Sequence, residues 1–291
     1  AGYFFSKRLL IPLRKIADEV NAISVQNLSG RIKSGASNDE WNYLSVTLNQ
    51  LLNRLQESFD IHRRFISNAS HELLTPLTSI SSQLEVSLDR DREAAAYRVV
   101  MESISQDIHQ LGRLTQTLLE FASASGDPNG LEIDLVRIDE ILLALPGEIA
   151  KLNNVYSVIL IFKELPEEDE KLLVFGNEAL LSTAIKNIVV NACKYSDSHR
   201  AKVKLHVHEN VITISIEDEG KGIPDSEFDK IFQPFYRVDN KNINQGFGLG
   251  LPLADQIIRL HKGRIWVKSE INKGTVFSIA LPSAGSLLHK K

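Results

Sequence analysis

The 291-residue chain lacks several features that define whole classes of protein. Its one cysteine, Cys193, excludes an intrachain disulfide, favours a reducing compartment and is expected to pack in a core. No run of eighteen apolar residues occurs, so the sequence predicts no complete transmembrane helix. The formal net charge of -4 and the pI of about 6.1 argue against nucleic acid as a partner.

The first residues carry the one hint of a membrane. Residues 1–6 are mainly apolar and aromatic, and the basic residues Lys7 and Arg8 follow at once. This order is typical of the cytoplasmic end of a transmembrane helix. We therefore expect residues 1–6 to be the end of such a helix, with an ordinary amphipathic helix start as the alternative.

Residues 7–60 are expected to form paired helices joined by an extended connector. Apolar residues fall at three- and four-residue spacings before and after a break at residues 26–32. The second stripe, which begins near Glu40, continues into residues 61–75 without glycine or proline. A single long helix is therefore expected to join this region to the next one, and pairing of such helices indicates a coiled coil.

Residues 61–124 have the pattern of a helical hairpin. Two amphipathic helices are expected at 62–90 and 93–123, each with one apolar stripe. Because two helices cannot bury both stripes by themselves, the pattern predicts a dimeric four-helix bundle. A turn-rich linker that contains glycine and proline follows at residues 125–131.

The hydrophobic period changes in residues 132–285. Alternating apolar residues at 203–207 and 212–216 predict half-buried strands. Helical patterns occur at about 138–152, 177–195 and 250–262. A mixed sheet covered on one face by helices, which is a two-layer α+β sandwich, accounts for this order. Residues 286–291 are expected to be a tail.

The pieces of a split nucleotide site begin on the helix expected at 177–195. Asn187, Asn191 and Lys194 lie three or four residues apart and therefore on one helical face. Amide oxygens are hard, neutral ligands that suit Mg²⁺, which keeps waters and shares phosphate oxygens. The ammonium of Lys194 supplies a point charge for phosphate. These residues predict Mg²⁺ at Asn191 beside the phosphates of a nucleotide.

Two glycine-rich segments supply further pieces. Asp218 follows a strand and precedes Gly220 and Gly222, so its carboxylate can accept from the amino group of adenine while the backbone approaches the base. Residues 246–250 contain three glycines and open a helix, whose N-terminal N–H groups favour phosphate. Taken alone, each segment is also typical of an ordinary turn or loop.

These pieces, closed by Gly274 and Thr275, follow the order of the Bergerat-fold ATPases, which include gyrase B and MutL relatives. The chain resembles that family, and the resemblance implies ATP binding. Arg237, in a segment similar to the family's ATP lid, is implied to meet the γ-phosphate, with a surface salt bridge as the alternative. The implied ATP contacts are Asn187, Asn191, Lys194, Tyr195, Asp218, Gly220, Gly222, Ile223, Gly246, Gly248, Leu249, Gly250, Leu251 and Thr275.

His71 opens the string His-Glu-x-x-Thr-Pro in the first helix of the hairpin. A neutral imidazole is a competent nucleophile at cellular pH. With the nucleotide pieces that follow it, this string resembles the bacterial sensor histidine kinases of two-component signalling. The resemblance implies that Glu72 takes the second ring proton and that Thr75 orients water against the phospho-aspartate of a receiver domain. As the alternative, the Thr75 hydroxyl bonds back to its own helical turn.

The resemblance covers nearly the whole chain and implies its organisation. Residues 7–60 would be a HAMP signal-relay domain, residues 61–124 a dimerisation and histidine phosphotransfer domain, and residues 132–285 a catalytic ATP-binding domain. The implied protein is a homodimer on the cytoplasmic side of a bacterial inner membrane. Its implied activity is Mg²⁺-dependent autophosphorylation of His71 by ATP, transfer to an aspartate of a response regulator, and phosphatase activity toward that regulator.

Two other functions stay open on the sequence. A Bergerat ATPase or chaperone-like machine would hydrolyse ATP without forming phosphohistidine, but it leaves the string at His71 unexplained. A non-catalytic dimeric relay would bind nucleotide only as a structural ligand, although Asn191 and Asp218 are intact. The chain departs from the kinase pattern at Leu74, which is often basic, at Asn177, which is often aspartate, and at Phe247, which is usually small.

Overall fold

The computed structural model describes residues 17–21, 27, 29–33, 40–124, 132–162, 166, 168–238 and 246–285. It divides into two compact units, Ala1–His71 and Glu72–Lys291. The transmembrane end expected at residues 1–6, the linker expected at 125–131 and the tail expected at 286–291 lie outside the described residues. No helix in the described ranges has the length and apolar character needed to cross a membrane.

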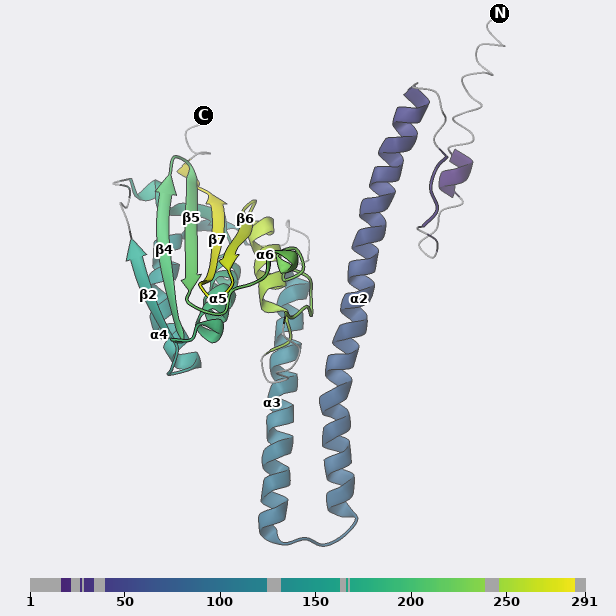
Figure 1. Cartoon of the computed structure of the whole chain (residues 1–291), viewed down its shortest axis with the longest axis vertical. Coiled ribbons are helices and arrows are strands. Elements are labelled where there is room, and N and C mark those ends of the chain that lie inside the picture. The colour runs from purple at the N-terminus through teal and green to yellow at the C-terminus, as the bar shows by residue number, and fades with distance from the viewer. Residues whose placement is uncertain are drawn as a thin grey trace, which may run out of the picture. The chain divides into compact units, whose positions relative to one another are not determined.

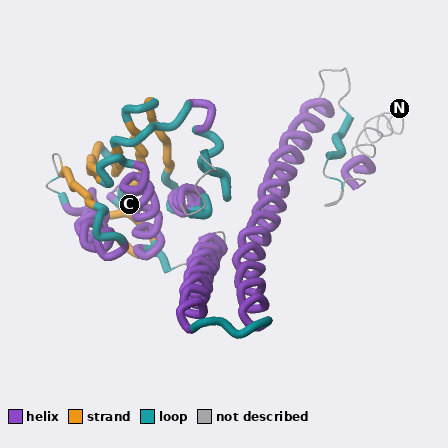
Figure 2. Tube along the Cα trace, turned by 60° about the horizontal axis from the view of Figure 1, so that its bottom comes forward, coloured by secondary structure: helices purple, strands orange, loops and turns teal. Residues whose placement is uncertain are grey.

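Helix α2 (Glu40–Leu88) and helix α3 (Ala94–Ala124) form the expected helical hairpin (Figure 1). The uninterrupted course of α2 confirms the predicted continuous helix. A short loop joins the two helices (Figure 2). Beside this loop the Tyr97 hydroxyl donates to the Ser87 carbonyl at 3.3 Å, which ties the start of α3 to the end of α2.

In the first unit, an extended connector is fixed to α2 by side chains. Asn49 accepts from the Ile32 N–H and donates to the Ile32 carbonyl, both at 2.9 Å, so its amide pairs with the connector as a neighbouring strand would. The guanidinium of Arg31 donates to Asn53 at 2.8 Å and to Gln56 at 2.6 Å. Ile32, which is 2% exposed, is buried as a result.

The second unit contains a five-stranded sheet in the order β2-β4-β5-β7-β6. β2 runs parallel to β4 and the other neighbours are antiparallel, which confirms the predicted mixed sheet. Every second residue of β5 is buried, as the sequence alternation predicts. The strands are β2 (Ser157–Phe162), β4 (Arg200–His208), β5 (Val211–Asp218), β6 (Arg264–Glu270) and β7 (Gly274–Pro282).

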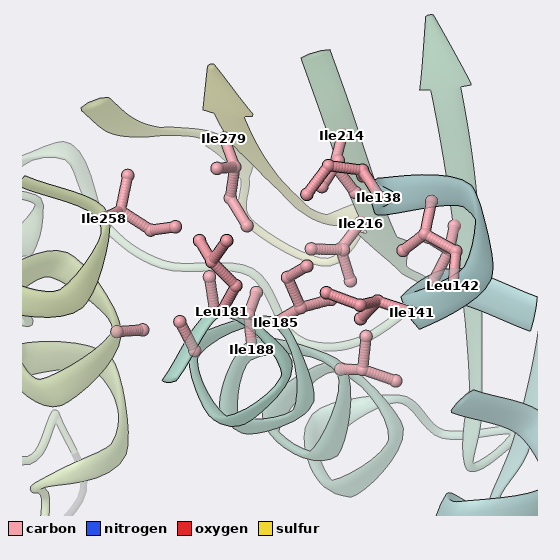
Figure 3. Close-up of a cluster of buried hydrophobic side chains, with 14 of the residues drawn as sticks. Ile138, Ile141, Leu142, Leu181, Ile185, Ile188, Ile214, Ile216, Ile258 and Ile279 are labelled. Carbon is pink, nitrogen blue, oxygen red and sulfur yellow. The ribbon is translucent and has the colours of Figure 1, made fainter. Parts of the chain in front are cut away.

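Three helices cover one face of this sheet, as expected (Figure 1). They are α4 (Ile138–Leu152), α5 (Glu178–Tyr195) and α6 (Gly250–Leu260). Their apolar stripes meet the inward side chains of the strands in one core. Figure 3 shows this core with Ile138, Ile141 and Leu142 from α4, Leu181, Ile185 and Ile188 from α5, Ile214 and Ile216 from β5, Ile258 from α6 and Ile279 from β7.

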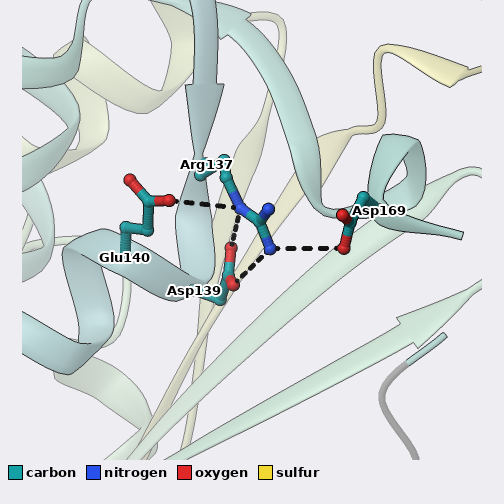
Figure 4. Close-up of polar contacts among 4 residues, drawn as sticks. All are labelled: Arg137, Asp139, Glu140 and Asp169. Carbon is teal, nitrogen blue, oxygen red and sulfur yellow. Dashed lines mark hydrogen bonds and ion pairs between the residues drawn. The ribbon is translucent and has the colours of Figure 1, made fainter. Parts of the chain in front are cut away.

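A second, two-stranded sheet was not predicted. β1 (Asp134–Arg137) pairs antiparallel with β3 (Leu173–Gly176). The guanidinium of Arg137 lies among three carboxylates (Figure 4), at 2.9 Å from Asp139 and 3.4 Å from Asp169. These ion pairs join β1 and the start of α4 to the chain just before β3. The described part of this unit also contains two short 3-10 helices, η2 (Asp169–Leu172) and η3 (Asp225–Glu227).

Two leucines of α4 test how much the core contributes to stability. Leu145 is 1% exposed and Leu143 is 60% exposed. We expect Leu145→Ala to lower the free energy of unfolding by about 2–5 kcal/mol, because it leaves a cavity in the core. Leu143→Ala on the opposite face should change it by less than about 0.5 kcal/mol. Urea denaturation measures both, and equal effects would contradict the observed packing.

Candidate nucleotide and phosphotransfer site

Asp218, at the end of β5, forms one side of the candidate nucleotide site. It is 9% exposed, and its Oδ1 accepts the Gly220 backbone N–H at 2.9 Å. Burial raises the pKa of the Asp218 carboxyl above its ordinary value, although backbone donors from Gly220 and Thr275 oppose the shift. A desolvated carboxylate gains stability from any further N–H donor that a ligand brings.

Two glycines allow neighbouring segments to approach the Asp218 turn. A Cβ at Gly274 would lie 2.0 Å from the Asp218 carbonyl oxygen, and the φ of Gly274 is 112°. A Cβ at Gly220 would lie 2.1 Å from the Tyr195 carbonyl oxygen. Only glycine fits either position without backbone movement. The turn therefore contacts both the start of β7 and the end of α5.

Ser269, on β6, belongs to this turn although the sequence did not single it out. Its hydroxyl accepts the Ile223 N–H at 2.8 Å and donates its own O–H to the Gly274 carbonyl at 2.9 Å. It also lies 2.9 Å from the Thr275 hydroxyl. Ser269 thus holds the segment after Asp218 against β7. The only sequence signal for it was the alternation of β6, which places it on the inward face.

The glycine segment before α6 lies against α5. A Cβ at Gly250 would lie 3.4 Å from Asn187 Oδ1, and a Cβ at Gly246 would lie 3.9 Å from Lys194 Nζ. Asn191 lies one turn after Asn187 on the same helix. The N-terminal end of α6 therefore begins beside the polar face of α5. A helix N-terminus next to a lysine is a suitable place for an anion.

Two cationic side chains come together on this side of the site. The pKa of Lys194 is lowered to about 8, mainly by burial and secondly by the positive charge of Arg237. The Lys194 ammonium also donates to the Tyr195 hydroxyl at 3.2 Å. The Phe235 N–H donates to the Gly248 carbonyl at 3.0 Å, which attaches the segment before Arg237 to the glycine segment. Phosphate oxygens between the two cations would reduce their mutual repulsion.

Three of the expected ATP contacts have apolar side chains that are wholly or partly buried. Leu249 is 2% exposed, and Leu251 and Ile223 pack against the core from partly buried positions. The Leu249 side chain is enclosed, which leaves its backbone groups for a nucleotide, and the assignment of all three residues as contacts stays a prediction. Gly222 has a φ of 73°, and a Cβ there would lie 2.3 Å from the carbonyl oxygen of Glu270, the last residue of β6.

The expected phosphotransfer residues lie on α2. His71, Glu72 and Thr75 are all exposed. The four-residue spacing places Thr75 on the face of His71, whereas Glu72 is turned by about 100°. His71 is the last residue of the first compact unit, and the elements of the nucleotide site belong to the second. Leu74, which replaces a residue that is often basic, is 60% exposed.

Two family models match the chain. Residues 61–126 match HisKA, the His Kinase A (phospho-acceptor) domain, and residues 176–285 match HATPase_c, the histidine kinase-, DNA gyrase B- and HSP90-like ATPase. Signal transduction histidine-protein kinase ArlS of Staphylococcus aureus is 31% identical, in an alignment that covers 96% of this chain. The chain spans 61% of the length of that relative.

Solved histidine kinases share the fold. Acinetobacter baumannii histidine kinase AdeS has a TM-score of 0.56 and 21% identity, over 74% of this chain and 98% of that one. Histidine kinase ThkA, solved in complex with response regulator protein TrrA, has a TM-score of 0.60 and 21% identity, over 79% of this chain and 64% of that one. Together with the two family models, this confirms the predicted helical hairpin followed by an ATP-binding domain of helices and strands.

The lowered pKa of Lys194 predicts how nucleotide binding depends on pH. The side chain is half neutral at about pH 8, and phosphate favours its charged form. Affinity for ADP should therefore fall as the pH rises from 7 to 9, and binding near pH 8 should take up protons.

Isothermal titration calorimetry in two buffers of different ionisation enthalpy measures this proton uptake. Lys194→Arg is the matched control, because guanidinium stays charged throughout this range. An arginine variant with the same pH dependence as the wild type would show that another group titrates.

Proposed function

The chain belongs to the sensor histidine kinases of two-component systems, and we propose that it transfers the γ-phosphoryl of ATP to His71 and then to an aspartate of a response regulator. The observation that carries this proposal is the coexistence of an exposed His71-Glu72 pair with an assembled split nucleotide site in one chain. A simple ATPase or a passive relay needs no such histidine.

The residues divide the chemistry of phosphoryl transfer among them. A ring nitrogen of His71 attacks the γ-phosphorus while the bond to the β–γ bridging oxygen breaks, and ADP leaves with that oxygen. Glu72 accepts the proton on the other ring nitrogen and so keeps the imidazole nucleophilic. Lys194 and Arg237 stabilise the negative charge on the transferring group. Asp218 holds the adenine through its amino group.

Asn191 is our proposed ligand for Mg²⁺. Within the described ranges, no three His, Cys, Asp or Glu residues cluster as a metal site would need. Amide oxygens, waters and phosphate oxygens can hold a cation here, which is how Mg²⁺ is commonly held beside a nucleotide. Asn191 and Asn187 on one face of α5 fit that chemistry. When bound, the ion would neutralise part of the phosphate charge.

Homodimerisation through the helical hairpin follows from its unburied apolar residues. Leu77, Leu84, Ile108 and Leu119 are each between 46% and 64% exposed. Apolar stripes of this kind favour a second copy of the hairpin, which completes a four-helix bundle. We assign this role to residues 61–124, and ATP binding to residues 132–285.

A HAMP-like relay is our proposal for residues 7–60. It is supported by the connector that Asn49 and Arg31 fix to α2, and by the continuation of α2 into the histidine segment. A response regulator receiver domain is the proposed partner. This proposal follows the solved complex of the histidine kinase ThkA with its response regulator TrrA.

Removing the nucleophile tests the proposed function directly. We expect His71→Gln to bind ADP as the wild type does, because the nucleotide elements lie outside the histidine segment, but to take no label from γ-labelled ATP and Mg²⁺. His62→Gln, an exposed histidine of the same helix, is the matched control and should label normally. The label should be acid-labile and stable in alkali. Undiminished labelling of His71→Gln would refute the assignment.

Thr75 tests the proposed phosphatase activity. Autophosphorylation does not need a hydroxyl one turn from His71, whereas hydrolysis of an aspartyl phosphate needs a positioned water. We therefore expect Thr75→Ala to label and transfer normally but to lose about 100-fold or more in dephosphorylation of its regulator.

The rate of phosphate loss from a phosphorylated regulator measures this effect. Ser70→Ala is the control, since the Ser70 hydroxyl donates to the Ile66 carbonyl of its own turn at 2.8 Å and lies on another face. If Thr75→Ala dephosphorylates the regulator at the wild-type rate, Thr75 is only a helix residue.

A further inference from the structure

His261, at the end of α6, is a buried histidine that the proposed chemistry does not use. It is 7% exposed, and both ring nitrogens have backbone partners. Nδ1 lies 2.7 Å from the Ile257 carbonyl, and Nε2 accepts the Asn177 N–H at 3.0 Å. Because an N–H can only donate and a carbonyl can only accept, Nε2 carries no proton and Nδ1 carries one. The two bonds fix a neutral ring in a single tautomer.

Asn177, whose N–H donates to His261, is the N-terminal cap of α5. Its side-chain oxygen accepts the Leu180 N–H at 3.0 Å, and its side-chain NH₂ donates to the Glu132 carbonyl at 3.3 Å. The ring itself packs on β3, because a Cβ at Gly176 would lie 2.4 Å from its Cδ2. His261 thus joins the end of α6 to the start of α5.

The nucleotide site lies at the other end of the same helix pair. α5 and α6 pack against each other, and α6 begins at Gly250 beside Asn187. α6 has 11 residues and is therefore about 16 Å long. A helix of this length moves as a rigid rod, so a displacement of the C-terminal end of α6 also displaces its N-terminal end.

We propose that His261 is a positioning residue for the nucleotide site, whose neutral ring holds α6 in register with α5 and whose protonation releases α6 and weakens nucleotide binding. This inference rests on the proposed nucleotide site. A protonated ring would present N–H to the Asn177 N–H, and two donors facing each other in a buried contact repel.

The surroundings of the ring determine the direction of the pH effect. Burial lowers the pKa of His261 below its ordinary value, against the smaller opposing effect of the Ile257 carbonyl. The titratable groups on the adjoining segments are Glu132, Glu178, Arg259 and Lys262, and none of these contributes to the shift. The contact is therefore intact above about pH 6.5 and is lost as the pH falls through the lowered pKa.

Two substitutions separate positioning from simple packing. His261→Gln keeps an acceptor near Nε2 but cannot be protonated, whereas His261→Leu removes the acceptor. In the full chain with Mg²⁺, calorimetric titration with ADP at pH 7.5 should find His261→Leu about tenfold weaker than the wild type, and His261→Gln close to it. As the pH falls below about 6.5, the wild type should weaken more steeply than His261→Gln.

The comparison with His261→Gln cancels the titration of the nucleotide and of every other group. A glutamine variant with the wild-type acid dependence would overturn the inference, and so would a folded His261→Leu with wild-type affinity at pH 7.5. Thermal denaturation at pH 7.5 establishes that each variant is folded. A wild-type chain that does not bind ADP at all would instead refute the proposed nucleotide site, so the two failures are distinguishable.

Discussion

Close backbone contact at two glycines is the constraint on which the nucleotide site depends. At Gly274 and Gly220, the space that a Cβ would fill is taken by the carbonyl oxygens of Asp218 and Tyr195. This contact brings strand β7, the turn after β5 and the end of α5 to a single point. It also excludes water from Asp218, which explains why burial dominates the pKa of that carboxyl. Any side chain at either glycine would separate these segments and rehydrate the carboxylate.

The same site contains two ionisable side chains, Asp218 and Lys194, whose charged forms are disfavoured by their burial. Burial raises the pKa of Asp218 and lowers the pKa of Lys194, so in both cases the ionised form is disfavoured. The two groups differ in sign, and in the proposed function Asp218 would face the adenine amino group and Lys194 the phosphates. A bound nucleotide would then bring an N–H donor to the carboxylate and anionic oxygens to the ammonium. Perturbed groups of this kind are concentrated at functional sites because ligand binding, rather than folding, offsets their cost.

Sequence patterns predicted the parts of the fold that local chemistry determines. Alternation specified β5, three-and-four spacing specified α4, and the absence of glycine and proline from residues 40–75 specified the continuous course of α2 as far as Pro76. The β1–β3 sheet escaped prediction because each strand has only four residues and the two strands lie far apart in the sequence.

The residues of the site also fall into two groups: those that a local sequence motif reveals, and those whose role arises from contacts with distant parts of the chain. Glycines and asparagines were visible because their spacing repeats a known order. Ser269 and His261 were not, since their roles arise from contacts with Gly274 and Asn177 that lie elsewhere in the chain. The side chains of Leu249 and Leu251 also differ from a simple motif reading, because they pack inward while the backbone between them begins α6.

The two kinds of domain differ in how completely they bury their apolar surface, and this difference has a functional meaning. The ATP-binding domain encloses residues such as Leu142, Ile185 and Ile214 completely within one chain. The hairpin leaves Leu77 and Ile108 about half exposed, and the second copy of the hairpin that we propose would cover them. A helix pair that is completed only by a partner can change its packing at lower cost than a closed core. The histidine therefore lies on the element whose packing is easiest to change, while the nucleotide is held by the element whose packing is fixed.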